Sequence, residues 1–123
     1  MSMIDDPAIT ALTRFLDVNV FRSELVMSNM ANIDTPGYRT RDINFSQEMQ
    51  RAGGNLEYAS FSPVARSVRG LMERPDGNNV SLERESLLLA DTQLSFNLGV
   101  QLLRDEFKGI LSAINSGNGG SGS

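Results

Sequence analysis

The chain has 123 residues, enough for one modest domain, and its 40% hydrophobic and 21% charged residues are ordinary for a folded protein. A net charge of −4 argues against a nucleic-acid-binding protein, because neutralising phosphates requires a basic surface. The sequence has no cysteine and no histidine, so it offers no disulfide, no cysteine-ligated zinc site, no thiol nucleophile and no imidazole base.

The sequence predicts neither a transmembrane helix nor a cleavable secretory signal. No apolar run approaches the roughly 18 residues that a transmembrane helix needs. The N-terminus lacks a basic segment followed by an apolar one, so we expect no cleavable secretory signal.

Residues 7 to 32 carry the pattern of a long amphipathic helix. Pro7 is tolerated in a first helical turn, and Asp5 and Asp6 suit the positive end of the helix dipole. Apolar residues recur at steps of three and four, in a stripe made of Ile9, Leu12, Leu16, Val20, Met27 and Met30. Because further apolar residues widen this stripe toward a second face, the helix is expected to pack against other helices.

The helical pattern ends in a tight turn. Pro36 lacks a backbone N–H and pushes Thr35 out of the helical region, while Gly37 supplies the positive φ angle that a type II turn requires. An extended segment with Arg39 and Arg41 follows. On physical grounds alone this is a helix terminus followed by a turn.

Residues 46–80 show no sustained pattern. Glycine and proline interrupt them closely, at 53–54, Pro63, Gly70 and 75–77. Two short stretches, 56–61 and 64–68, are compatible with strands but too short to predict as such. We therefore expect a loop-rich, largely irregular and partly disordered insert.

A second long helix is predicted over residues 81–115. Ser81 is a favourable N-cap, and Glu83 and Glu85 suit the first turn of a helix. Apolar residues recur every seven positions, at Leu82, Leu89, Phe96, Leu103 and Ile110. The positions four residues further on become apolar from the middle of the helix, at Val100, Phe107 and Ile114. This spacing predicts a coiled-coil seam.

The same helix carries more than the seam. A neighbouring apolar face consists of Leu87, Ala90, Leu94, Leu98 and Leu102, which indicates contacts with more than one partner. Gly99 and Gly109 either cost helix stability, about 1 kcal/mol each, or allow another helix to approach closely. Residues 116–123 are rich in glycine and serine and are expected to form a flexible tail.

The predicted fold is mainly α, with two long terminal helices that form a coiled-coil-like pair joined by the insert. We divide the chain into an N-terminal helix with its turn (1–45), the insert (46–80), the C-terminal helix (81–115) and the tail (116–123). A two-helix hairpin buries too little apolar surface to be stable alone. The core is therefore expected to be completed by other subunits.

Nothing in the sequence supports catalysis. The acidic pairs Asp5/Asp6, Glu83/Glu85 and Asp105/Glu106 are explained as helix ends or solvated charges. The segment Asp76–Asn79 lacks the further ligands of a calcium loop, and no phosphate-binding glycine motif is present. We expect no enzymatic activity, cofactor, metal or small-molecule substrate.

Two strings, one within residues 28–45 and one at residues 75–80, resemble signatures of bacterial flagellar rod and hook proteins. Ala31-Asn32 followed by Asp34-Thr35-Pro36-Gly37-Tyr38 resembles their N-terminal signature, and Arg41-Asp42-Ile43-Asn44-Phe45 is similar to the continuation found in proximal rod proteins. Pro75-Asp76-Gly77-Asn78-Asn79-Val80 resembles the string that precedes their C-terminal helix. The chain departs from this pattern at Thr92, where asparagine is usual, and at Phe96, where tyrosine is common.

The resemblance implies a structural subunit of the proximal rod in the flagellar basal body. That rod is a drive shaft, required for flagellum-dependent motility, which transmits torque from the MS ring toward the hook. The implied partners are other copies of the chain, other rod proteins, MS-ring and rod-junction proteins and, in transit, the flagellar type III export apparatus. The implied location is the periplasmic rod, reached without a cleavable signal.

We expect the assembly contacts at the turn and along the seam, at Asn29, Ala31, Asn32, Thr35, Pro36, Gly37, Tyr38, Arg39, Arg41, Leu82, Leu89, Phe96, Val100, Leu103, Phe107 and Ile110. Two alternatives belong to other classes. A secreted helical effector or chaperone-bound export substrate would share the helices, but it has no reason to carry the Thr-Pro-Gly-Tyr turn. A small enzyme would need a catalytic constellation that the sequence does not supply.

Overall fold

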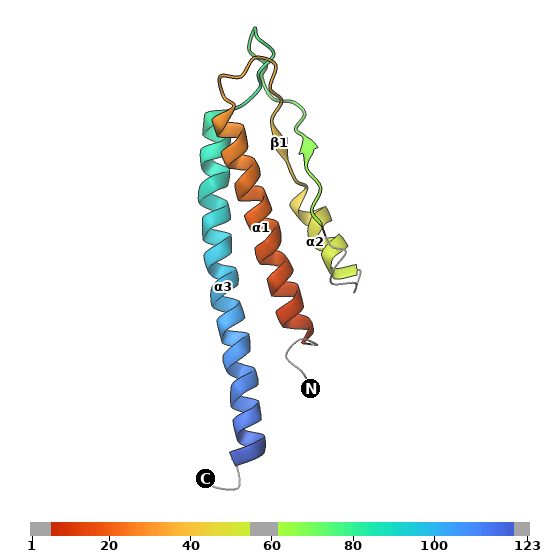
Figure 1. Ribbon diagram of the computed structural model, residues 1–123, viewed down its shortest axis with the longest axis vertical. Coiled ribbons are helices and arrows are strands. Elements are labelled where there is room, and N and C mark those ends of the chain that lie inside the picture. The colour runs from red at the N-terminus through yellow and green to blue at the C-terminus, as the bar shows by residue number, and fades with distance from the viewer. Residues whose placement is uncertain (1–5, 55–61, 120–123) are drawn as a thin grey trace.

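The computed structural model describes residues 6–54 and 62–119. Its elements are α1 (Pro7–Ala31), β1 (Arg41–Asp42), α2 (Phe45–Gly54), β2 (Arg66–Ser67) and α3 (Leu82–Gly119). Figure 1 shows an elongated molecule in which α1 and α3 run antiparallel, while α2 and the two strands lie along the other side of α1. The prediction of a mainly helical fold with paired terminal helices is confirmed.

Helix α1 begins and ends where its capping residues predict. The carboxylate of Asp6 accepts hydrogen bonds from the backbone N–H groups of Ala8 (2.8 Å) and Ile9 (3.2 Å), which have no partner within the helix. At the other end, the side-chain amide of Asn32 donates to the carbonyl of Ser28 at 2.8 Å. These local interactions explain why the predicted boundaries of this helix are accurate.

Helix α3 is longer than predicted. It has 38 residues against 25 in α1, so its C-terminal part extends beyond the first turn of α1 (Figure 1). The Gly/Ser tail was expected from residue 116, but the helix continues through Gly119, and residues 120–123 lie outside the described part. An existing helix gains one backbone hydrogen bond for each residue that it adds, which offsets the low helix propensity of this segment.

The insert contains a helix that was not predicted. Asn44 caps α2, because its Oδ1 accepts the backbone N–H of Gln47 at 3.0 Å. Asn44-Phe-Ser-Gln47 has the spacing of a helix start, a signal that the expectation of an irregular insert missed. Strands β1 and β2 pair antiparallel, and β2 falls within the 64–68 stretch. The 56–61 stretch lies outside the described residues.

Helix α2 is attached to its surroundings by one aromatic pair and one buried carboxylate. The rings of Phe15 in α1 and Phe45 in α2 meet edge to face, with centroids 5.7 Å apart. The fully buried Glu48 accepts the backbone N–H of Val64 at 3.2 Å and pairs with Arg51 at 2.5 Å. The chain segment that returns toward β2 is therefore held against α2.

The helix pair approaches closely at Gly99. A Cβ atom at this position would lie 2.7 Å from Cδ2 of Leu16 and 2.9 Å from Cδ2 of Phe15, distances that real Cβ contacts do not reach. At Gly109 a Cβ atom would meet nothing within 4 Å. Of the two roles considered for these glycines, close helix approach therefore applies at Gly99 and not at Gly109.

Candidate assembly surface

The two signature strings fold onto each other at one end of the helix pair. Gly37 donates its N–H to the carbonyl of Asp76 at 2.8 Å. The side-chain amide of Asn78 donates to the carbonyls of Asn32 (2.9 Å) and Thr35 (2.8 Å). Contacts between residues 39 to 46 positions apart in sequence thus join the two strings into one compact structure.

Glycine is required where these turns meet. Gly37 has a φ angle of 75° and Gly77 one of 87°, which confirms the positive φ angle predicted at Gly37. A Cβ atom at Gly77 would make an ordinary van der Waals contact with the Cα atom of Gly37, at 3.4 Å, and one at Gly37 would meet nothing within 4 Å. The backbone conformation of the two turns, and not a lack of space, therefore requires these glycines.

Asn79 joins the second string to the segment before β1. Its Oδ1 accepts the N–H of Thr40 at 2.6 Å, and its carbonyl accepts the hydroxyl of Thr40 at 3.2 Å. Thr40, Asn78 and Asn79 are all buried. Asn78 and Asn79 are not among the predicted site residues, although they belong to the string that carries the resemblance.

Asn29 lies at the centre of a buried polar network. Its amide nitrogen donates to Glu85 Oε1 (2.6 Å) and to the carbonyl of Arg41 (2.8 Å). Its amide oxygen accepts the N–H of Arg41 (3.1 Å) and the hydroxyl of Tyr38 (3.0 Å). The side chain thereby uses both donors and both acceptor positions of an asparagine amide.

Charged groups extend this network across three elements. Glu85 Oε2 pairs with Arg84 at 2.8 Å, and Arg84 reaches Asp42 at 2.7 Å. Arg22 of α1 binds the same carboxylate through two nitrogens, at 3.0 and 3.1 Å. We call Arg22, Asn29, Asp42, Arg84 and Glu85 the polar clasp. It ties α1, β1 and the start of α3 together.

The environment of Asp42 determines its protonation. Burial by itself would raise the pKa of Asp42, but hydrogen bonds from Arg22, the N–H of Ile43 and Arg84, with the charge of Arg22, hold that pKa below its ordinary value of 3.8. The carboxylate is therefore ionised at neutral pH and stabilises the fold in that form.

This lowered pKa predicts a loss of stability in acid. Because the folded state favours ionised Asp42, its contribution is fully present above the ordinary value of 3.8 and disappears as pH falls through the folded-state pKa. We expect the stability difference between the native chain and Asp42→Asn, measured by urea unfolding, to shrink as pH is lowered from neutral into that range. A difference that stays constant over this range would contradict the assignment.

The turn residues expected at an interface occupy different environments. Ala31, Thr35, Pro36, Gly37, Arg39 and Arg41 are exposed, Asn32 and Tyr38 are half-buried, and Asn29 is buried. Arg39 pairs with Glu73 at 2.7 Å, with both side chains about half exposed, so this ion pair contributes little to stability. The side chain of Asn29 is used within the subunit.

The predicted seam lies beside the line of closest helix contact. Leu89, Phe96, Val100, Leu103 and Ile110 are half-buried, while Leu82 and Phe107 are 53% and 45% exposed. The buried line of α3 runs instead through Glu85, Thr92 and Gly99, which are also seven residues apart. The buried positions of α3 therefore do recur every seven residues, but polar residues and a glycine occupy them instead of the apolar residues of the predicted seam.

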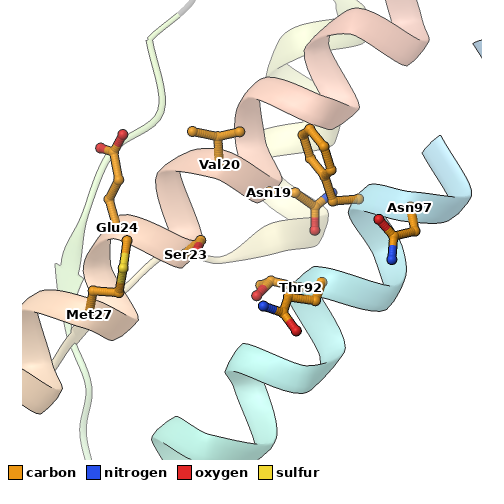
Figure 2. A pocket seen from close by; sticks show the side chains of 9 residues that line it. Asn19, Val20, Ser23, Glu24, Met27, Thr92 and Asn97 are labelled. Atoms are coloured by element: carbon orange, nitrogen blue, oxygen red, sulfur yellow. The ribbon is translucent and has the colours of Figure 1, made fainter. Parts of the chain in front are cut away.

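Two apolar surfaces are left open by the helix pair. Leu87, Leu94, Leu98 and Leu102 of α3, which we call the outer leucine face, are between 44% and 73% exposed. Between α1 and α3 lies a groove of about 590 Å³, lined by Asn19, Val20, Ser23, Glu24 and Met27 from α1 and by Thr92, Gln93, Phe96 and Asn97 from α3 (Figure 2).

Residues 6–54 and 62–119 contain no group of three or more acidic side chains placed to hold a metal ion. Within the same ranges, no helix combines the length and the apolar character needed to cross a membrane.

The chain is similar to several known proteins, although no protein-family profile matches it. The flagellar basal body rod proteins FlgB of Salmonella typhimurium and Escherichia coli are each 29% identical to it over 133 aligned positions, covering 92% of this chain and 96% of the relative. FlgB of Cereibacter sphaeroides is 34% identical over 106 positions, covering 76% of this chain and 82% of the relative. An identity of this level over most of both chains, joined to a mainly helical fold, shows that the chain belongs to the FlgB family of structural rod proteins in the flagellar basal body.

Proposed function

We propose that this rod subunit enters the basal body by burying the outer leucine face and the α1–α3 groove against other copies of itself and other rod proteins. The observation that carries the proposal is the exposure of the outer leucine face, with Leu87 at 73% and Leu94 at 71%. Burying a leucine side chain stabilises by roughly 1.5–3 kcal/mol, so four such side chains provide a substantial driving force for assembly.

The thin core of the single subunit supports the same proposal. Among the described residues, Val18, Val26, Ile43 and Val80 are the hydrophobic side chains that are buried. Contiguous exposed apolar surface on a protein marks an interaction site. Contacts with neighbouring subunits would therefore bury the apolar surface that the two-helix core of one subunit leaves exposed.

In this proposal each segment of the chain has a separate role in the assembly. The terminal helices, within residues 1–45 and 81–115, make the contacts that build the rod and carry torque from the MS ring toward the hook in a motile cell. The exposed turn residues, including Pro36, Arg39 and Arg41, contact neighbouring subunits or the MS-ring junction. Within the insert, 46–80, helix α2 and strand β2 lie on the side of α1 away from α3 (Figure 1), and the chain reaches the periplasm through the flagellar type III export apparatus.

Charged residues placed on the outer leucine face test the proposal. We expect Leu94→Asp combined with Leu98→Asp to leave the helix content of the purified chain unchanged, because both side chains are mostly exposed. The same variant should be absent from isolated basal bodies and leave cells non-motile, because aspartate cannot be buried in an apolar interface without a partner.

A matched control adds the same charge elsewhere on α3. Ser86 and Asn115 are exposed and lie outside the outer leucine face. Ser86→Asp combined with Asn115→Asp should enter basal bodies and support motility. Motile cells carrying the two leucine replacements would show that this face is not an assembly surface.

A further inference from the structure

The β1–β2 side of the molecule displays unpaired positive charge. Arg41, Arg66 and Arg69 are exposed, and within the described residues none of them forms an ion pair. Two exposed apolar side chains accompany them, Val64 at 44% and Met72 at 90%. We call these five residues the basic edge.

The start of α3 displays the opposite charge. Glu83 and Asp91 are exposed and, within the described residues, have no ion-pair partner. Leu87 and Leu94 follow at helical steps of four and three, so all four residues lie on one face. We call Glu83, Leu87, Asp91 and Leu94 the acidic edge.

The two edges lie on opposite sides of the molecule at a similar height. Figure 1 shows α3 on one side of α1 and the strands on the other. The contact of Arg84 with Asp42 places the first turn of α3 level with β1. Two copies standing side by side and pointing the same way would therefore bring the basic edge of one to the acidic edge of the next.

We propose that the basic edge binds the acidic edge of a second copy in this parallel, side-by-side arrangement. The inference rests on the proposed function and names the lateral contact through which copies meet. Each edge carries exposed apolar side chains together with charges of one sign. In the contact, the arginines of one copy would face the carboxylates of the next, and the apolar side chains of the two copies would be buried against each other. Because the edges are different surfaces on opposite sides, every bound copy leaves one of each free, and the contact propagates instead of closing into a two-fold pair.

Disulfide trapping tests the pairing, because the chain has no native cysteine. Ser67 lies next to Arg66, Ala90 lies next to Asp91, and both are exposed. One chain with Ser67→Cys and another with Ala90→Cys are mixed under mild oxidation. We expect the mixed disulfide to exceed both like-with-like dimers. Like-with-like dimers in excess would overturn the proposal.

Charge reversal tests whether attraction between opposite charges holds the basic edge against the acidic edge. Arg41→Glu with Arg69→Glu in the Ser67→Cys chain should lower the yield of mixed disulfide by about tenfold, since like charges then face each other. Glu83→Arg with Asp91→Arg in the Ala90→Cys chain should restore it. A yield that falls and is not restored by this second reversal would overturn the proposal, as would a yield that does not fall.

The control reverses charges outside both edges. Arg104 and Lys108 are exposed on α3 and belong to neither edge. Arg104→Glu with Lys108→Glu in the Ser67→Cys chain should leave the yield of mixed disulfide within about twofold of the parent, because reversing surface charges away from the contact has little local effect. Circular dichroism of every variant should show unchanged helix content, and the restored yield itself reports that both reversed chains are folded.

Trapping in isolated basal bodies separates this inference from the proposed function. A chain with both cysteines that is present in basal bodies and forms disulfide-linked multimers there supports both. If it is present without such links, the lateral contact is wrong and the proposed function stands. If the native chain itself is absent from basal bodies, the proposed function fails, whatever disulfides form in solution.

Discussion

Replacing Glu85 by leucine is expected to lower the free energy of unfolding by about 3 kcal/mol, the scale of breaking a buried ion pair. Glu85 is fully buried, accepts a hydrogen bond from Asn29 at 2.6 Å and pairs with Arg84 at 2.8 Å. Leucine fills a similar volume but accepts neither bond. One donor of Asn29 and one nitrogen of Arg84 would then lose their partner in a confined site.

Glu83 supplies the matched control for this prediction. It lies two residues earlier in the same first turn of α3, but its side chain is exposed. Glu83→Leu should change the free energy of unfolding by no more than about 0.5 kcal/mol, the range typical of surface substitutions. Urea unfolding followed by circular dichroism measures both variants. Equal losses for the two would show that Glu85 acts only as a first-turn charge.

Replacing Gly99 by leucine should destabilise the helix pair by at least about 2 kcal/mol, within the range for overpacked cores. The first added carbon alone would lie 2.7 Å from Leu16 and 2.9 Å from Phe15. The remaining carbons of leucine need further space, so α1 and α3 must separate or Phe15 must leave its edge-to-face contact with Phe45. The gain in helix propensity, about 1 kcal/mol, is too small to compensate.

Gly109 isolates the contribution of helix propensity. It lies ten residues further along the same helix, and a Cβ atom there meets nothing within 4 Å. Gly109→Leu should raise the free energy of unfolding by up to about 1 kcal/mol, because leucine is the better helix former. Thermal or urea unfolding of the two variants should therefore move in opposite directions. If Gly99→Leu is stabilising as well, the close approach of α1 and α3 is not required.

The polar clasp shows where sequence analysis was incomplete. Glu85 was interpreted as a first-turn charge that complements the helix dipole, yet it is the most deeply buried residue of that turn. Its partners come from α1 and from the segment around β1. Periodicity assigns charged residues to the surface, and nothing local in the sequence indicates which of them meet an opposite charge from a distant segment.

The missed helix α2 has a different explanation. Its start is encoded locally, by Asn44 and Gln47, but its ten residues are few and end in Gly53-Gly54. Such a short helix is marginal by itself and depends on tertiary contacts. Phe15 of α1 supplies one such contact, to Phe45, and the backbone N–H of Val64, which binds the buried Glu48, supplies another. Both partners reach α2 only after the chain has folded.

The sequence by itself determined the two long helices, the turn that follows the first of them and the relationship to flagellar rod proteins. Capping residues, apolar periodicity and the Pro36-Gly37 pair act over a few neighbouring residues, so they can be interpreted without knowing the fold. Only the tertiary structure decided which face of α3 meets α1. That helix carries several lines with a seven-residue spacing, and the close approach at Gly99 together with the polar clasp selects the line through Glu85, Thr92 and Gly99. The outer leucine face is left uncovered for the same reason, because one neighbouring helix can bury only one side of α3.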